Sequence, residues 1–450
     1  MNNSLLQSDS ELFTHIQNEE IRQRQQLQMI PSENYVSKSV LNAVGSILMN
    51  KYSEGQPNKR YYQGNTNIDQ IELLAKKRAL DLFKLDNQEW DVNVQAVTGS
   101  IANLAVLSAL LEPSDRILSM YLYDGGHLSH GWQLPDGKKV SFSSKIFDIH
   151  YYRVDPKTEK FNYDEVEKVA IEVKPKLIIT GGTAYPGEID YRRMRQISDQ
   201  VGAFYLADVA HEAGLIAAGV NKSPFEYADV VTMTTRKTLR GPIGALIFSR
   251  REDNQTYHSK IGLNTKIDKA VFPGLQGGPM NHSIAGIAAC LYEANQSSFT
   301  QYAKQILLNS KRLAEKLSNY GFRIVSGGTD KHLVLIDLSN KNCKGKNFAF
   351  ALEKVNIIVN ANTHPREQGS PFNPTGLRLG TPAITSRGMK EDDMNKIANW
   401  INQTMELIKD APKNFEEFKT FLQQPNTQFD QVANEVKTFA LEFPVPGLDN

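Results

Sequence analysis

A lysine flanked by two arginines stands at the end of an apolar run in VVTMTTRKTLRGPIGALIF, residues 230–248. Burying an ammonium group is costly and lowers its pKa, so Lys237 at a buried strand end would favour a neutral amine able to form a Schiff base. Alternatively, Arg236, Lys237 and Arg240 could form a phosphate-binding patch. The Schiff-base hypothesis requires a phosphate cradle, a carboxylate for a ring nitrogen and a ring-stacking group elsewhere in the chain.

Three further motifs supply candidates for these groups. TGSIAN, residues 98–103, opens a helical pattern, and its small residues could expose backbone N–H groups to a phosphate, although a plain capped helix start explains it equally well. Asp208 ends the apolar run AFYLADVA, where a buried carboxylate must either find a cation or strong donors or cap the next helix. His127, in the glycine-rich YDGGHLSHG, could bring an imidazole close to a planar ligand.

A metal site is the rival interpretation of the same histidines. His127 and His130 are three residues apart, as are Asp208 and His211, and this spacing can chelate a metal from one helical face. The sequence has no HExxH motif, and the glycines beside His127 favour a loop, so we expect no metal. It also contains neither GxGxxG nor GxxxxGK[ST], so no Rossmann or P-loop nucleotide site is supported.

Composition narrows the class of protein. The chain has 450 residues, enough for two domains, with 40% apolar and 22% charged residues. Its 51 basic and 50 acidic side chains give a net charge of +1, which predicts neither nucleic-acid nor membrane binding. No signal peptide or spanning apolar run is apparent, and Cys290 and Cys343 stand alone. We therefore expect a reduced, cytoplasmic protein without a structural zinc site.

Short apolar runs alternate with helical patterns after residue 67, which predicts βαβ units in a mainly parallel sheet. The expected strands are VNVQAV, DRILSM, KLIITGG, AFYLADVA and DVVTMTT. Ligands bind beyond the carboxyl ends of the strands in such sheets. Because the loops at Thr98, Thr183, Asp208 and Lys237 each follow an expected strand, we expect them to converge on one crevice.

The flanking segments predict an N-terminal helical arm and a second domain. A helix over SELFTHIQNEEIRQRQQLQMI should stop before Pro31, and SVLNAVGSILMNKY should form another. The long helical pattern FTQYAKQILLNSKRLAEKLSNYG precedes the strands RIVSG and HLVLIDL, and NTQFDQVANEVKTFALEF should form a helix packed on this second domain. The expected division is 1–60, 61–298 and 299–450.

The chain resembles the serine hydroxymethyltransferase family of pyridoxal-phosphate enzymes, from about residue 10 to residue 410. The resemblance rests on ten motifs in one order, which are IPSEN, NKYSEGQPNKRYY, TGSIAN, GGHLSHG, GGTAYPGEID, DVAHEAGLIAAG, TTRKTLRGP, VFPGLQGGP, VSGGTDKHLVLIDL and GLRLGTPAIT. It implies the α/β fold type I of aspartate aminotransferase, with a mainly parallel mixed seven-stranded sheet, helices on both faces, and a smaller α+β C-terminal domain.

For the cofactor, the resemblance implies that Lys237 forms a Schiff base with pyridoxal phosphate, Asp208 pairs with the pyridine nitrogen, and His127 stacks on the ring. Thr183 and His211 would lie beneath the ring or near its phenolic oxygen. The remaining cofactor-binding residues would be Thr98, Gly99, Ser100 and Thr234, together with Tyr52, Gly277 and Gly278 from a neighbouring subunit. The shared site makes at least a homodimer necessary for activity.

For the substrates, the resemblance implies that Arg378, in GLRLG, holds the amino-acid carboxylate with Ser32, Tyr62 and His211. Glu54 would act as an acid and base near the substrate hydroxyl, which completes a catalytic set of Lys237, Glu54, His127, Asp208 and Tyr62. The tetrahydrofolate pocket would contain Glu54, Tyr61, Leu122, Gly126, Leu128 and Asn362. The implied reaction converts serine and tetrahydrofolate reversibly into glycine and 5,10-methylenetetrahydrofolate.

The sequence departs from the family pattern near the lysine. Arg236 replaces the usual His, Ile243 replaces the Arg of GPRGG, Gln56 and Asn58 replace Tyr and Gly in EGYPGKRYY, and GGP is followed by MNH. Arg236 could restore the charge lost at Ile243 if the two occupy the same space. If they do not, a folate-independent aldolase or transaldolase for threonine-like 3-hydroxy amino acids is an alternative. Another is a catalytically weak partner subunit or RNA-binding protein, against which the retained catalytic residues and the near-neutral charge argue.

Overall fold

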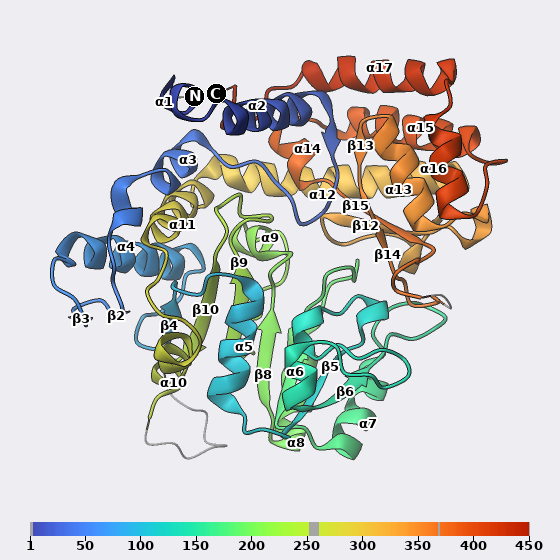
Figure 1. Cartoon of the computed structure of the whole chain (residues 1–450). Helices are drawn as coiled ribbons and strands as arrows, with labels where there is room; N and C mark the ends of the chain where they lie inside the picture. The colour runs from blue at the N-terminus through green and yellow to red at the C-terminus, as the bar shows by residue number, and fades with distance from the viewer. Residues whose placement is uncertain (1–2, 252–260, 368–369, 450) are drawn as a thin grey trace.

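Two β-sheets organise the chain in the computed structural model, which describes residues 3–251, 261–367 and 370–449 (Figure 1). We call the part built around the seven-stranded sheet the large lobe and the part built around the four-stranded sheet the small lobe. The small lobe lies above the large lobe in Figure 1, and the N-terminal helices lie along the top of both. The expected fold class, an α/β sheet domain with a smaller α+β part, is confirmed.

The large sheet has the strand order β4-β10-β9-β8-β7-β5-β6. Its strands are β4 (Trp90–Asn93), β5 (Arg116–Met120), β6 (Asp148–Tyr152), β7 (Leu177–Thr180), β8 (Phe204–Asp208), β9 (Val230–Thr234) and β10 (Ala245–Arg250). All five expected strands form. The sequence interpretation missed β6 and β10, and β10 pairs antiparallel with both of its neighbours, which makes the sheet mixed.

Both faces of this sheet are covered, which explains why its strands are apolar throughout. In β8, Tyr205 and Ala207 belong to one hydrophobic core, whereas Phe204 and Leu206 belong to another on the opposite face. The helices around the sheet are α4 (Thr66–Leu82), α5 (Gly99–Leu110), α6 (Phe142–Ile146), α7 (Tyr163–Val173), α8 (Tyr191–Val201), α9 (Ala213–Ala217), α10 (Leu263–Lys269) and α11 (Asn281–Ala294).

The small sheet is antiparallel, with the order β11-β12-β15-β14. Its strands are β11 (Arg323–Ile324), β12 (Leu333–Asp337), β14 (Asn360–Asn362) and β15 (Gly376–Gly380), and its helices are α12 (Ser297–Asn319), α13 (Gly345–Lys354), α14 (Pro382–Ser386), α15 (Glu391–Leu407), α16 (Phe415–Gln423) and α17 (Thr427–Leu441). The expected strand RIVSG is short because a 3-10 turn begins at Val325. The expected C-terminal helix is α17, which packs on α15 and on the N-terminal α2.

The N-terminal segment differs from the sequence interpretation at two points. Helix α2 (Ser10–Gln25), which follows the short α1 (Asn3–Ser8), ends well before Pro31. It ends because β1 (Leu27–Gln28) pairs in parallel with β13 (Ile357–Ile358), which buries Leu27 in the core of the small lobe. The expected second helix divides at Gly45 into α3 (Lys38–Val44) and a 3-10 turn, Ile47–Asn50.

The arm therefore touches both lobes, since α3 packs on α11 of the large lobe whereas β1 joins β13. The division at residues 60 and 298 stays a proposal. A small hairpin of β2 (Gly55–Gln56) and β3 (Lys59–Arg60) follows the arm. No helix within the described ranges has both the length and the apolar character needed to cross a membrane.

Candidate active site

One cavity lies where segments after five strands of the large sheet approach the small lobe. It is lined by Thr98, Gly99, Ser100, Asn103, His127, Gly182, Thr183, Asp208, Ala210, His211, Thr234, Arg236 and Lys237. We call it the Lys237 cavity. The loops at Thr98, Thr183, Asp208 and Lys237 meet there, so the convergence expected from the strand pattern is confirmed.

Lys237 follows β9 and is buried, with 8% of its surface exposed. Burial lowers the pKa of its amine to about 8, although the negative charge of Asp208 opposes this shift. The positive charges of Arg378 and Arg236 lower the pKa further. A substantial fraction of the amine is therefore neutral near physiological pH, which is the state that a nucleophilic lysine needs.

Asp208 ends β8 and faces the same cavity. Burial would raise the pKa of this carboxyl, but a hydrogen bond and positive charge from His130 hold it well below its usual range. The Oδ2 atom lies 2.9 Å from His130 Nε2 and accepts a hydrogen bond from Asn103 Nδ2 at 2.8 Å. The Oδ1 atom accepts from the Ala210 amide at 3.0 Å and has capacity for a second donor, such as a protonated ring nitrogen.

His127 presents its imidazole to the cavity from the glycine-rich loop. Its Nδ1 lies 2.7 Å from Ser129 Oγ, and Asn103 Nδ2 donates to the same hydroxyl at 2.9 Å. Burial, followed by the charge of His130, lowers the pKa of His127 to about 4. The ring is therefore neutral at physiological pH, which suits stacking on a flat cofactor better than ion pairing.

The start of α5 forms the end of the cavity suited to a phosphate. Thr98 caps the helix by accepting a hydrogen bond from the Ile101 amide, and Gly99 and Ser100 form its first turn. A Cβ atom at Gly99 would lie 2.7 Å from the methyl group of Thr234, so a larger residue would crowd this end. Free N–H groups at a helix N-terminus favour a phosphate, and the hydroxyl of Ser100 adds a donor.

The small lobe contributes two residues that approach this cavity. Arg378 on β15 is buried, and its Nη1 donates to the Thr183 carbonyl at 2.6 Å while its Nε donates to Asn360 Oδ1 at 3.2 Å. Burial lowers the pKa of Arg378 to about 10, so the guanidinium stays charged at neutral pH. His332 stacks on His211, with ring centroids 5.4 Å apart.

Three residues next to the cavity or in its wall were missed in the sequence interpretation, namely Asn103, His130 and His332. Asn103 lies at the end of TGSIAN, where it links Asp208 to Ser129 and also accepts a hydrogen bond from Thr232. For His130, the sequence spacing indicates only a metal ligand. A histidine directly before an apolar strand, such as His332 before β12, was the sequence signal that could have identified this residue. Its contact with His211 joins the two lobes, so the partner could not be predicted from the sequence.

His127, His130 and Asp208 are also the group that could hold a metal ion, since their ligand atoms lie within 4.8 Å of one another. However, the Nε2 of His130 is already directed at Asp208, and Asn103 donates to the same carboxylate oxygen. These contacts already satisfy that carboxylate oxygen. The arrangement suits the support of a buried anionic carboxylate, and we do not propose a metal site there.

A second group of expected site residues lies outside the Lys237 cavity. It consists of Tyr52, Glu54, Tyr61, Tyr62, Gly277 and Gly278, and we call it the tyrosine cluster. Tyr52 and Tyr62 pack edge to face with centroids 5.3 Å apart, and Tyr61 packs similarly on Phe272. A Cβ atom at Gly278 would lie 3.2 Å from the Tyr52 ring, and one at Gly277 would lie 3.2 Å from Glu54 Oε1. The β2–β3 hairpin beside this cluster lies at the left edge of Figure 1, away from β8 and β9.

The expected folate residues are also distributed. Leu122 and Leu128 lie in 3-10 turns of the loop that carries His127, and Gly126 approaches the Met120 carbonyl so closely that a Cβ atom would lie 2.2 Å away. The Gly126 carbonyl accepts a hydrogen bond from Thr183 Oγ1 at 3.0 Å. Asn362 ends β14, beside the strand that carries Arg378. The expected folate residues therefore come from the loop that carries His127, the tyrosine cluster and the small lobe.

The three basic residues around the lysine have different settings. Arg240 has a left-handed backbone (φ 60°), and its guanidinium lies 4.2 Å from the centroid of the Tyr302 ring, so it supports the loop and does not line the cavity. Arg236 is exposed and lines both the Lys237 cavity and a neighbouring groove. Ile243 and Ser32 line that same groove. Arg236 and Ile243 thus line one groove, and the exchange of charge between them stays a hypothesis.

The residues present fit pyridoxal phosphate. A helix N-terminus offers donors for the phosphate, the ionised Asp208 can accept from a pyridinium, and the neutral ring of His127 offers a stacking surface. The amine of Lys237 lines the same cavity and is partly neutral near pH 7. The four groups thus occur together in one cavity, which is the arrangement that this cofactor needs.

Comparison with known proteins agrees with these features. The sequence profile of the family described as serine hydroxymethyltransferase matches residues 5–401. Serine hydroxymethyltransferase of Caenorhabditis briggsae is 45% identical over 453 residues, which cover 98% of this chain and 88% of that protein. The mitochondrial enzyme of Candida glabrata is 43% identical (98% and 91% covered), and the cytosolic enzyme of Eremothecium gossypii is 42% identical (98% and 96% covered). The chain therefore belongs to the serine hydroxymethyltransferase family.

Proposed function

We propose that the protein is a pyridoxal-phosphate-dependent serine hydroxymethyltransferase. It would transfer the hydroxymethyl group of serine to tetrahydrofolate and release glycine and 5,10-methylenetetrahydrofolate. The observation that carries this proposal is the buried, partly neutral Lys237 in one cavity with the ionised Asp208, in a chain that matches this family over almost its whole length.

Four groups of the large lobe would hold the cofactor. Lys237 would hold it through Nζ, and the α5 N-terminus with Thr98 and Ser100 would bind its phosphate. Asp208 would keep the proton on the ring nitrogen, and His127 would cover the ring. The chemistry that bound pyridoxal phosphate supplies is an electron sink for the bond broken at the Cα of the amino acid.

Arg378 is the residue that would bind the amino-acid carboxylate. Its Nη1 and Nε are held by Thr183 and Asn360, so the nitrogen not used in these two bonds, Nη2, is available to a substrate. The planar guanidinium is thereby fixed before the substrate arrives, which lowers the entropy cost of binding. Once the substrate occupies the site, Lys237 would move protons at Nζ, because its pKa near 8 allows both protonation states.

The acid/base groups for the hydroxymethyl group would be Glu54 and Tyr62, with Ser32 near the carboxylate. Since the tyrosine cluster and the Lys237 cavity are separate in one chain, we propose a homodimer in which each site takes the cluster from the partner subunit. Such a dimer, or a tetramer built from two of them, would also complete the folate pocket. We place the protein in the cytoplasm, which the two free cysteines support.

The decisive experiment measures serine turnover with and without tetrahydrofolate in the cofactor-loaded protein. We expect glycine formation from serine to depend on folate, and the visible absorbance of the lysine-bound cofactor to disappear in Lys237→Ala. Folate-independent cleavage of threonine at a comparable rate would instead favour the aldolase alternative. A wild-type protein that shows no cofactor absorbance at saturating pyridoxal phosphate would contradict both enzyme functions.

A further inference from the structure

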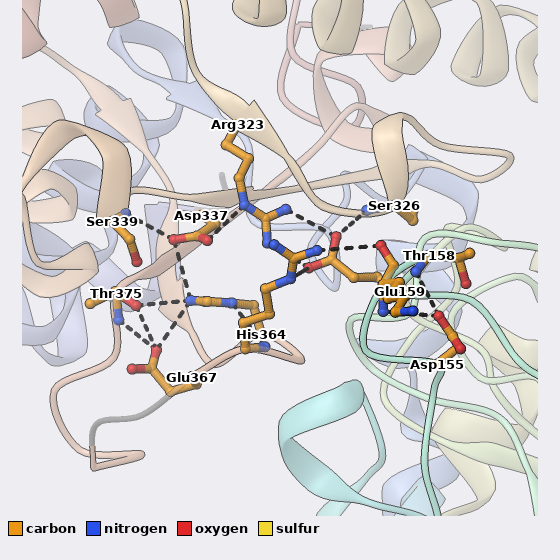
Figure 2. Close-up of polar contacts among 12 residues, drawn as sticks. Asp155, Thr158, Glu159, Arg323, Ser326, Asp337, Ser339, His364, Glu367 and Thr375 are labelled. Carbon is orange, nitrogen blue, oxygen red and sulfur yellow. Dashed lines mark hydrogen bonds and ion pairs between the residues drawn. The ribbon is translucent and has the colours of Figure 1, made fainter.

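A buried carboxylate of the large lobe lies among basic residues of the small lobe, outside the Lys237 cavity. Glu159 is 3% exposed and accepts two hydrogen bonds from the guanidinium of Arg323, at 2.5 and 3.0 Å (Figure 2). The Ser326 amide donates to the same carboxylate at 2.8 Å. This bidentate pair joins the turn between β6 and α7 to strand β11, so it is a contact between the lobes.

Hydrogen bonds within the turn that carries Glu159 fix the direction of this side chain. Asp155 Oδ1 accepts hydrogen bonds from the amides of Lys157 and Thr158, and the Asp155 amide donates to the Lys160 carbonyl. These bonds tighten the turn and leave Glu159 with a left-handed backbone, φ 57°. A residue other than glycine in this region is strained, so the turn maintains an unfavourable conformation that directs the carboxylate at Arg323.

The contact continues through the small lobe as a closed ring of polar groups. Arg323 Nε donates to Asp337 Oδ2 at 2.9 Å, and Asp337 Oδ1 lies 3.4 Å from His364 Nε2. The Arg366 amide donates to His364 Nδ1 at 3.3 Å, and the side chain of Arg366 returns to Glu159, with Nε 3.3 Å from Oε1. We call Glu159, Arg323, Asp337, His364 and Arg366 the lobe ring.

His364 joins this ring only in its neutral form. Its Nδ1 accepts from the Arg366 amide, so the proton must be on Nε2, which lies 2.8 Å from Thr375 Oγ1. The Thr375 hydroxyl in turn donates to Glu367 Oε2 at 3.0 Å. Burial lowers the pKa of His364, although the carboxylates of Asp337 and Glu367 oppose this, and the neutral tautomer is therefore the favoured one.

The lobe ring holds the hairpin that carries Arg378. His364 lies two residues after β14, and Thr375 lies immediately before β15, so their contact joins the two ends of the loop between these strands. Asn360 on β14 pairs with Arg378 on β15 and accepts a hydrogen bond from its Nε. Arg378 is thus fixed at one side by Thr183 of the large lobe and at the other by a hairpin tied to Glu159.

We propose that Glu159 and His364 are positioning residues for the amino-acid substrate, because together they set the orientation of Arg378 over the Lys237 cavity. This inference rests on the proposed function of Arg378. The ring is not needed to keep the lobes together, since Lys331 pairs with Glu212 at 2.9 Å and the Asp330 amide donates to the Pro186 carbonyl at 3.0 Å. Every residue that lines the Lys237 cavity belongs to the large lobe, so cofactor binding is independent of the ring.

The test is the Glu159→Gln variant, which keeps the size of the side chain and removes its charge. We expect the KM for serine to rise about tenfold, whereas kcat and the Kd for pyridoxal phosphate change less than about twofold. The matched control is Glu167→Gln, which breaks a pair of the same 2.5 Å length with Arg193 inside the large lobe and should leave all three quantities unchanged. An unchanged KM in Glu159→Gln, or equal losses in both variants, would overturn the proposal.

Two further measurements separate positioning from general destabilisation. Combining Glu159→Gln with His364→Leu should raise KM no more than the stronger single variant, because both open one ring, and additive effects would count against the ring. If Glu159→Gln does not fold, Arg366→Gln replaces it in the same kinetic test, because the side chain of Arg366 is half-exposed and also contacts Glu159. In cofactor-free protein, hydrogen exchange at the Ser326 amide should be faster in Glu159→Gln than in the wild type. Unchanged exchange would contradict the proposal. This measurement does not depend on serine turnover, so it tests the lobe ring even if the proposed function is wrong.

Discussion

The Lys237 cavity and the tyrosine cluster hold residues expected to act in one reaction, but their settings are opposite. Lys237 and Asp208 are buried, and their surroundings move the pKa of each far from its ordinary value. Tyr52, Tyr61 and Tyr62 are 56%, 70% and 45% exposed. In that cluster, the negative charge of Glu54 raises the pKa of Tyr62, whose side chain remains exposed.

This difference shows which part of the active site a single chain can enclose. A protein shifts the pKa of a side chain mainly by removing water and placing fixed charges around it, and both require an enclosed site. The sheet and its loops enclose the cofactor half of the site within a single chain. The acid/base half remains on the surface, and a second copy is the proposed means of enclosing it.

The largest expected effect comes from breaking the exposed half. Glu54→Gln should reduce kcat for serine by about 10²-fold, because the carboxylate would be the general acid and base, while the cofactor absorbance stays unchanged. The exposed carboxylate Glu112, changed to Gln, is the control and should have no effect.

The same variant can test whether the two halves belong to different subunits. Coexpression of Glu54→Gln with Lys237→Ala should restore about one quarter of wild-type activity, since half of the random dimers would contain one intact site. Each variant alone should show no more than about one hundredth of wild-type activity in the same assay. A mixture without recovery would contradict a site shared between subunits.

A smaller effect is expected on the stability of the protein when Lys237 in the buried half is changed, and it can be measured without substrate. In cofactor-free protein near pH 7, Lys237→Met should raise the free energy of unfolding by roughly 3 kcal/mol, because it removes a charge that burial disfavours. The folded protein loses this proton above pH about 8, whereas the unfolded chain keeps it until about pH 10.4, so wild-type stability rises between these values.

The advantage of Lys237→Met should therefore shrink as the pH rises, which urea unfolding at pH 7 and pH 10 would measure. Lys237→Arg is the matched control. It stays charged at both pH values, so its disadvantage should persist. A constant difference between wild type and Lys237→Met would show that burial does not tune this amine.

The smallest effect is expected at the rim of the Lys237 cavity. Arg236→His should change kcat/KM by no more than about fivefold, because Arg236 is exposed and its charge is screened by water. Steady-state kinetics with serine and folate would measure this change. Complete loss of activity would mean that Arg236 is itself essential. Ile243→Arg, in the same groove, is the companion variant, and its combination with Arg236→His tests whether the two positions share one charge.

Much of the fold was predictable because hydrophobic patterns are local. All five expected strands of the large sheet form, since each is an apolar run bounded by polar or glycine-rich turns. The end of α2 was not predictable, because Leu27 continues the helical pattern but gains more by pairing with Ile357, which is 330 residues away along the chain. Strand β6 was missed because DIHYY contains a charge and a histidine, which blur its alternation.

The candidate site follows the same division. Motifs identified Lys237, Asp208, His127 and the α5 start, and the strand order brings them together. The contacts of His130 and Asn103 with Asp208 were not predictable, because they join a 3-10 turn and helix α5 to the end of β8, which lies 78 and 105 residues away along the chain.

The sequence by itself determined which residues could do the chemistry and that parallel strands would gather them, since residue types and apolar periodicity are written along the chain. Only the tertiary structure decided which of them are enclosed. Loops distant in sequence bury Lys237, which lowers the pKa of its amine, and they bring His130 to Asp208, where the hydrogen bond lowers the pKa of the carboxyl although burial opposes it. The same applies to the lobe ring, where Glu159 meets Arg323 across 164 residues.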